Sequence, residues 1–405
     1  MAVVSLLTQT RPAYVGAPIH YEAPATKGPV ERLQAKLRVG EFDLAYDAQK
    51  GWLPALLTAL DIPVSSQGLV FSKTSLQVAR ISPKTPRAIY FGDDVYVAWI
   101  PGAPWIEVSS MDPERGPVFY ALLQRREGGP RFERRDTQCL TCHASPRTNG
   151  WPGTLIRSVH TKADGHPRYA SGSFLTTYQS PLRQRWGGWY VTGTHGRERH
   201  MGNSVLAPHA TEIDLDAGAN VSDLSQRFDT SRYPTAHSDI VALMVLEHQT
   251  QMHSQIARAS FEARRLLDCC RTPEERSERL ARIAKPLVEH LMFQGEARLH
   301  DRICGTSGFA AEFSARARRD PHGRSLRDFD LRRRLFRYPC SYVIYSPAFD
   351  ALPRPLLDVV YAQLLRVLRG GAREEGYKYL SRPRRKAILE ILLATKRGLP
   401  AAWRD

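Results

Sequence analysis

The stretch AIYFGDDVYVAWI (88–100) decides the fold of the first half of the chain. It is dense in β-branched and aromatic residues, and a Gly-Asp-Asp turn interrupts it at Gly92. Two such runs around a short turn predict a β-hairpin. Similar short runs, bounded by glycines and prolines, continue from about residue 65 to residue 200. We therefore expect this part of the chain to be rich in strands.

The second half of the chain has a helical pattern instead. SDIVALMVLEHQTQMHSQIARASFEARRLLD begins at Ser238 and contains no glycine or proline. Ser238 is a suitable N-cap, and Asp239 would lie in the first turn, where the helix dipole favours an acid. Further helical patterns occur at 29–42, 52–62, 273–294, 325–336, 354–369 and 383–396.

These patterns together predict an α+β fold. A strand-rich N-terminal part would carry the CxxCH motif described below, and an α-helical C-terminal part would pack against it. We expect an irregular lead-in at 1–29, a β-rich domain at 30–205 and a helical domain at 236–405. The residues between the two domains form a connecting segment rich in Pro, Gly, Asp and Ser.

The chain is strongly basic, with a formal net charge of +16 over 405 residues. A positive surface attracts acidic partner proteins and other anions. The arginines are scattered, and no zinc-finger repeat or RNP-like aromatic motif is present, so we expect no nucleic-acid binding. No apolar run approaches the roughly 18 residues that a transmembrane helix needs. We therefore expect no transmembrane segment in the chain.

The segment TQCLTCHAS (137–145) contains the motif with the most specific chemistry. Cys139 and Cys142 are three positions apart, and His143 follows directly. On one helical turn, two thiols at this spacing can form thioethers to the two vinyl groups of a haem, and the histidine can then bind the iron. The motif predicts one covalent haem c, with His143 as proximal iron ligand, and makes the β-rich domain a haem-attachment domain.

Two other interpretations of the motif remain open. A structural zinc site would need two more ligands, and the usual second CxxC or HxxxH pair is missing from the chain. A thiol redox site usually places CxxC at a helix start after a strand, with a Trp or Gly before it and a Pro inside it. Here Gln138 precedes the motif, and Leu140 and Thr141 fill the gap.

A second axial ligand would have to be a histidine or methionine that reaches the iron. His248 is the first candidate, since it lies with Met252 on the apolar stripe of the predicted long helix, one turn apart. His195 follows, because a Gly-Thr-His-Gly turn at a strand end should expose it. Met252 and His253 are the remaining candidates. A histidine in an apolar stripe is often only a core residue.

A candidate haem pocket surrounds the glycine-bounded strand RWGGWYVTGTHG (185–196). Trp189 and Tyr190 could wall an apolar pocket there. Arg157 and Arg197 could pair with haem propionates, because a guanidinium group matches a carboxylate. Each of these residues also has an ordinary interpretation, as core for the aromatic pair and as solvated charge for the arginines.

The cellular compartment follows from the haem hypothesis. Haem is attached to CxxCH outside the cytoplasm, so we expect a periplasmic or exported protein. No signal peptide is visible at the start of the sequence, which suggests that the start site is misassigned. The pairing state of the other four cysteines, Cys269, Cys270, Cys304 and Cys340, is not fixed by their positions.

The sequence also resembles an uncharacterised bacterial family of large monohaem cytochrome c-domain proteins. The similarity lies in QCLTCHAS, RWGGWYVTGTHGRERHMGN, HSDIVALMVLEHQTQMH, GTSGFAAEFSARARRD and RRLFRYPCSYVIYSPAFDALP, and it extends from about residue 30 to 400. It implies a c-type haem at Cys139, Cys142 and His143 in an exported protein, and no particular activity.

Three functions fit these observations. The first is electron transfer through the haem, with a redox partner protein that is acidic and is steered by the basic surface. The second is a haem enzyme, a peroxidase-like or small-molecule oxidoreductase with an open sixth iron position. The third is a haem-based sensor with the same open position. A zinc-binding cytoplasmic protein is the alternative without haem.

Overall fold

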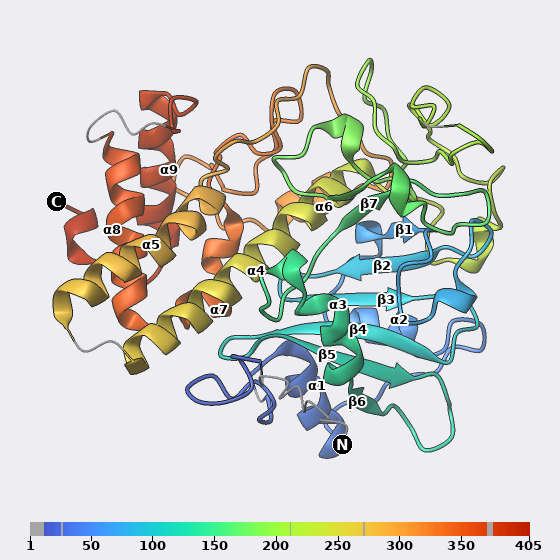
Figure 1. The fold of residues 1–405 in the computed structure, drawn as a ribbon, viewed down its shortest axis with the longest axis horizontal. Helices are drawn as coiled ribbons and strands as arrows, with labels where there is room; N and C mark the ends of the chain where they lie inside the picture. Colours follow the sequence, from blue (N-terminus) through green and yellow to red (C-terminus); the bar gives the residue numbers. More distant parts are fainter. Residues whose placement is uncertain (1–11, 26, 211, 270–271, 371–375) are drawn as a thin grey trace, which may run out of the picture.

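A computed structural model of the chain describes residues 12–25, 27–210, 212–269, 272–370 and 376–405. Within these ranges an antiparallel sheet of seven strands forms one side of the molecule, and a group of helices forms the other (Figure 1). The strand-rich N-terminal part and the helical C-terminal part that the sequence predicts are therefore confirmed. In the described part of the chain, no helix is long and apolar enough to cross a membrane.

The main sheet is built largely from consecutive antiparallel strands. Across the sheet the order is β6 (Phe132–Arg134), β5 (Gly116–Leu123), β4 (Trp105–Asp112), β3 (Val95–Trp99), β2 (Arg87–Phe91), β1 (Gly68–Val70) and β9 (Trp189–Tyr190). β2 and β3 form the predicted hairpin around Gly92, with Phe91 paired to Tyr96. β7 (Arg157–Val159) and β8 (Ser173–Leu175) form a separate two-stranded ribbon.

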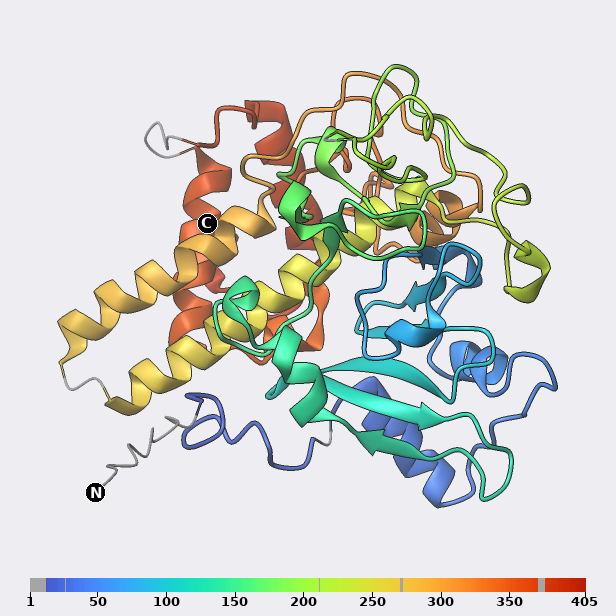
Figure 2. The same ribbon diagram turned by 45° about the vertical axis from the view of Figure 1, so that its right-hand side comes forward.

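The helices lie on both faces of the main sheet and continue beyond it into the C-terminal part. They are α1 (Pro29–Arg38), α2 (Leu53–Ala59), α3 (Asp136–His143), α4 (Ile240–Cys269), α5 (Pro273–Leu291), α6 (Phe309–Ala315), α7 (Pro347–Asp350), α8 (Arg354–Arg369) and α9 (Arg382–Thr395). α1 and α2 cover one face of the sheet, with Val30 and Leu53 in the same buried cluster as Val97 and Val108. α3 and α4 lie on the opposite face (Figure 2).

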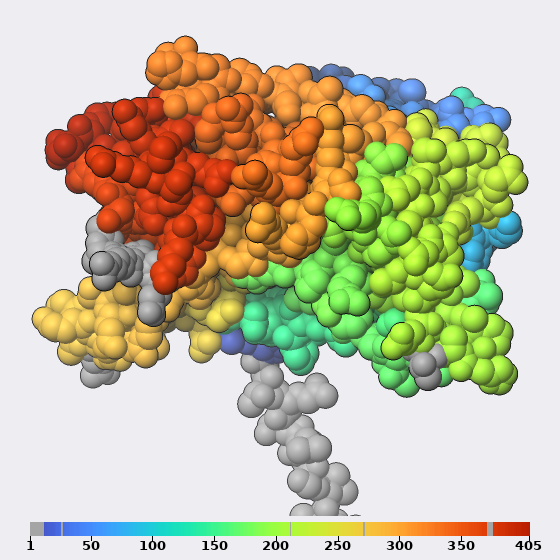
Figure 3. Space-filling view, turned by 90° about the horizontal axis from the view of Figure 1, so that it is seen from above, coloured from blue at the N-terminus to red at the C-terminus, as the bar shows by residue number. Residues whose placement is uncertain are grey.

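One hydrophobic core extends from the sheet into the helices. It includes Val70, Phe91 and Tyr96 of the strands together with most of the buried side of α4. α5 and α8 pack against each other and continue this core toward the C-terminus. Seen from above, the C-terminal helices lie at the opposite end of the molecule from residues 212–230 (Figure 3).

The long helix begins one residue later than predicted, at Ile240. Asp239, and not Ser238, caps it, because the Asp239 Oδ1 atom accepts from the backbone N–H groups of Val241 and Ala242. The Ser238 hydroxyl instead donates to the Tyr190 carbonyl and ties the helix start to β9.

The prediction of a helix at 325–336 is wrong. The Asp330 Oδ1 atom accepts from the backbone N–H groups of Arg332 and Arg333, and the Asp328 carboxylate accepts from the N–H of Ser325. Such side-chain bonds compete with helical backbone bonds and favour turns. The segment folds into turns that an isolated bridge between Phe329 and Phe336 closes.

Candidate functional site

The CxxCH motif lies on α3, a helix of two turns that begins directly after edge strand β6. Asp136 lies in its first turn, where an acid is favoured, and pairs with Arg134. On one side of α3, Leu140 and Ala144 pack against a buried cluster that contains Phe261 of α4. The helix is therefore held between the sheet and α4, as a short helix within the strand-rich part.

His143 ends α3, and its orientation is fixed by the backbone. Its Nδ1 atom lies 2.8 Å from the carbonyl oxygen of Gly153. A carbonyl can only accept, so Nδ1 carries the proton, and the lone pair of the neutral ring is on Nε2. Metal-binding histidines usually show this arrangement, in which the second ring nitrogen donates to a carbonyl or carboxylate.

The surroundings of His143 also keep the ring neutral. Its ring packs against Phe119 of β5, with 4.6 Å between the ring centroids. Burial lowers the pKa of His143, while the bond to Gly153 raises it in part. Only a neutral imidazole can donate its lone pair to a metal ion, so burial favours the ligating form, and the bond to Gly153 selects the tautomer with the lone pair on Nε2.

The two cysteines of the motif are free thiols with different exposure. Cys142 is exposed and Cys139 is half-buried. Burial raises the pKa of Cys139 to about 12, and the carboxylates of Glu107 and Asp136 add to the effect. Redox-active CxxC sites instead depress the pKa of the attacking thiol. The environment of Cys139 therefore disfavours the thiol redox interpretation.

The zinc interpretation also lacks support from the geometry. Within the described ranges, no group of three or more His, Cys, Asp and Glu side chains is arranged to hold a metal ion. Structural zinc sites use four such ligands. A haem iron needs only one or two from the protein, because the porphyrin supplies the other four.

Beside α3, a strip of the sheet face is only partly covered. Its members lie on β2, β3 and β4 and are partly exposed, whereas most of their neighbours on the other face are buried. We define this open strip as Arg87, Ile89, Ala98, Trp105, Glu107 and Ser109. Ile89, Ala98 and Glu107 are paired across three strands, so they share one face.

α3 lies directly along this open strip. At the start of the helix, the Arg135 guanidinium lies 5.3 Å from the centre of the Trp105 ring. At its end, His143 packs on Phe119, which is paired with Ser109 of the strip. Toward the other edge of the sheet, a hydrogen bond from Trp189 Nε1 to the Arg157 carbonyl holds β7 over β9. The strip is therefore flanked by α3 and β7 (Figure 1).

The structure does not bring His248 into contact with α3. His248 is fully buried among aromatic side chains and stacks on Phe293, with 4.0 Å between the ring centroids. Its Nε2 atom lies 2.8 Å from the Ser341 hydroxyl. In the described structure, its hydrogen-bond and ring partners all lie outside α3.

The other ligand candidates are also engaged elsewhere. His195 is fully buried, so the expected exposure of its turn is wrong; its Nδ1 donates to the Glu198 carbonyl, and its Nε2 accepts from the N–H of Asn220. His253 is buried with its Nδ1 atom 2.8 Å from the Tyr96 hydroxyl, and Met252 lies in the main core.

The four residues of the candidate pocket do not form one cavity. Trp189 and Tyr190 are successive strand residues, so they point to opposite faces of the sheet and join different core clusters. Arg157 donates to the Ser173 hydroxyl, and Arg197 is an exposed residue whose backbone N–H bonds to Asp301. The open strip, which the sequence analysis did not identify, lies nearer to the motif.

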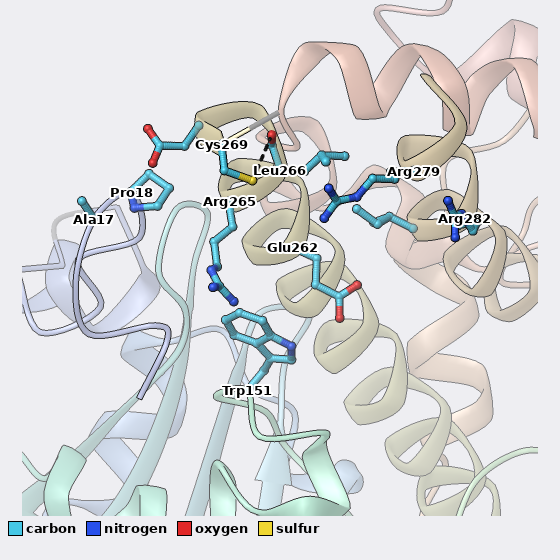
Figure 4. A pocket seen from close by; sticks show the side chains of 11 residues that line it. Ala17, Pro18, Trp151, Glu262, Arg265, Leu266, Cys269, Arg279 and Arg282 are labelled. Carbon is cyan, nitrogen blue, oxygen red and sulfur yellow. Dashed lines mark hydrogen bonds between the residues drawn. The ribbon is translucent and has the colours of Figure 1, made fainter. Parts of the chain in front are cut away.

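A separate cleft of ≈490 Å³ opens between α4, α5 and the N-terminal segment (Figure 4). The Arg265 guanidinium lies over the Trp151 ring, 6.0 Å from its centre. Arg279 and Arg282 extend from α5 on the other side. The residues that line this cleft do not include the CxxCH motif, so it is distinct from the open strip.

Comparison with known proteins adds no assignment. No protein-family model, curated protein or solved structure matches this chain.

Proposed function

We propose that the protein is a monohaem c-type cytochrome that transfers electrons through a haem bound covalently to α3. Cys139 and Cys142 would form the two thioether bonds, and His143 would bind the iron. The observation that carries the proposal is the bond from His143 Nδ1 to the Gly153 carbonyl, which leaves the Nε2 lone pair for a metal.

The exposure of the motif supports the same assignment. Thioether formation needs access to both sulfur atoms; Cys142 is exposed and Cys139 is half-buried. The haem supplies the redox chemistry when it is attached. Cys139, Cys142 and His143 would hold it, while the Gly153 carbonyl orients the His143 imidazole and Phe119 packs against that imidazole.

Export and the redox partner belong to the same proposal. Haem attachment to CxxCH takes place outside the cytoplasm, so the chain would act in the periplasm or beyond it. The net charge of +16 would attract an acidic redox partner and accelerate its association at low ionic strength.

A haem enzyme or sensor with an open sixth position is the second candidate. The contacts of His248, His195, His253 and Met252 favour it, because each of these side chains already has another environment away from α3. A ligand such as carbon monoxide could then reach the iron directly.

The test is to produce the protein in a host that attaches haem to exported CxxCH proteins. The intact mass should increase by one haem, and the pyridine haemochrome should show the band of a haem with two thioether bonds. His143→Ala should retain the added mass, and its visible absorption spectrum should lose the features that histidine ligation of the iron gives the parent. Cys139→Ala with Cys142→Ala is the matched control and should carry no haem.

The spectrum then separates the two candidates. A low-spin spectrum that carbon monoxide does not change supports electron transfer. A high-spin iron that binds carbon monoxide supports the enzyme or sensor. A parent protein that matures without any added mass, in a host that loads a known cytochrome c, would refute both.

A further inference from the structure

The open strip contains a partly buried ion pair with an unused hydrogen-bond donor. Arg87 Nη1 donates to Glu107 Oε2 at 3.0 Å, and the two side chains are only 16% and 24% exposed. The Nε atom of Arg87 is buried and has no hydrogen-bond partner within the described part of the chain. A buried guanidinium N–H without an acceptor is unfavourable, so this atom is suited to bind an added acceptor.

Glu107 is held firmly and cannot supply that acceptor. Its Oε1 atom accepts from Gln77 Nε2 at 3.1 Å and from the Ser75 hydroxyl at 3.4 Å. Gln77 is 7% exposed and also donates to the Trp105 carbonyl. Both oxygens of Glu107 are therefore engaged, and the carboxylate fixes the position of Arg87.

The register places this ion pair beside the CxxCH motif. Glu107 is paired with Ala121 of β5, and Phe119, which carries the His143 ring, lies two residues before Ala121 on the same face. The electrostatic effects of the Arg87 and Glu107 side chains on the motif agree with this placement. Arg87 lowers the pKa of His143, and Glu107 raises the pKa of both His143 and Cys139.

We propose that Arg87 binds a propionate carboxylate of the haem attached to α3, and that Glu107 and Gln77 are its positioning residues. The inference rests on the proposed function and adds the surface on which the haem lies, the open strip. A guanidinium group that already uses one edge for Glu107 can donate from Nε to a second carboxylate.

The two charges should act on the redox potential in opposite directions. Oxidised haem carries one more positive charge at the iron than reduced haem. The Arg87 cation disfavours the oxidised form and raises the potential, whereas the Glu107 anion favours the oxidised form and lowers it. Because the pair is mostly shielded from solvent, screening should leave a measurable effect of each charge.

The experiment is a spectroscopic redox titration of haem-loaded protein. Arg87→Gln should shift the midpoint potential below that of the parent, and Glu107→Gln should shift it above. Arg354→Gln and Asp358→Asn are matched controls on α8, where an ion pair of 2.9 Å lies at the other end of the molecule (Figure 1). Both controls should keep the potential of the parent.

The outcomes separate this inference from the proposed function. If the variants carry covalent haem and their potentials equal those of the controls, Arg87 does not bind the haem and the inference is wrong, while the cytochrome assignment stands. Shifts of the same sign in both variants would also overturn it. If no haem is attached to the parent, the proposed function itself fails. Glu107→Gln tests the pair even where Arg87→Gln does not fold.

Discussion

Cys139 in protein made without haem is expected to react with iodoacetamide much more slowly than an ordinary cysteine. Burial raises its pKa from the ordinary 9.0 to about 12. At pH 8 an ordinary thiol is about one tenth thiolate, whereas Cys139 would be about one ten-thousandth. The thiolate is the reactive form, so the loss of thiolate alone slows the reaction about a thousandfold.

The higher basicity of the Cys139 thiolate offsets part of this loss. Nucleophilicity increases with thiol pKa with a Brønsted coefficient of about 0.4–0.5, which returns about 15- to 30-fold over three pKa units. The net expectation is a reaction about 30- to 60-fold slower at pH 8. The rate should still increase tenfold per pH unit up to pH 10, where an ordinary cysteine has already levelled off.

Peptide mapping by mass spectrometry measures the alkylation of each cysteine over time. The same protein unfolded in urea is the matched control, because Cys139 then has no tertiary environment. Cys139→Ser identifies the peptide unambiguously. If Cys139 in the folded protein reacts as fast as in urea, or levels off near pH 9, then α3 does not bury this thiol as described. The thiol redox interpretation would then regain support.

Two further predictions concern buried charges away from the motif. Asp94→Asn should stabilise the protein at pH 8 by at most about 4 kcal/mol and change little at pH 4. Burial raises the pKa of Asp94 to about 7 from 3.8, so the folded state loses stability as the pH rises between these values. Urea unfolding at both pH values measures this, and the same substitution in a His253→Gln background removes the contribution of the imidazole whose Nε2 lies 3.8 Å from Asp94 Oδ1. Arg185→Met should cost about 3–5 kcal/mol in the same assay, because it leaves Glu247 buried without its partner.

The sequence predicted elements whose signals are local. The hairpin at 88–100 needs only a turn between two apolar runs, and α8 needs only an apolar stripe between a proline and a glycine. The helix at 325–336 failed because Asp328 and Asp330 bond to nearby backbone N–H groups, which a count of apolar spacings ignores.

The candidate site could be predicted only in part. CxxCH is contiguous, so the motif itself could be read from the sequence, whereas its place on the short helix α3 comes from the structure. The open strip depends on register: Arg87 and Glu107 are 20 residues apart and meet only because β2, β3 and β4 align. Trp105, Glu107 and Ser109 alternate along the sequence with Ile106 and Val108, which indicates that they share the less buried face of a strand. By the same rule, the adjacent residues Trp189 and Tyr190 of a strand point to opposite faces.

The openness of the strip makes covalent attachment a physical requirement of the proposed function. A haem held by contacts alone needs a deep apolar pocket that removes most of its surface from water. The strip is shallow and contains a charged pair, so the apolar haem surface that it could bury would be small. Two thioether bonds remove the need for a deep pocket. Because Cys142 is exposed, a haem attached there would be accessible to a partner protein for electron exchange.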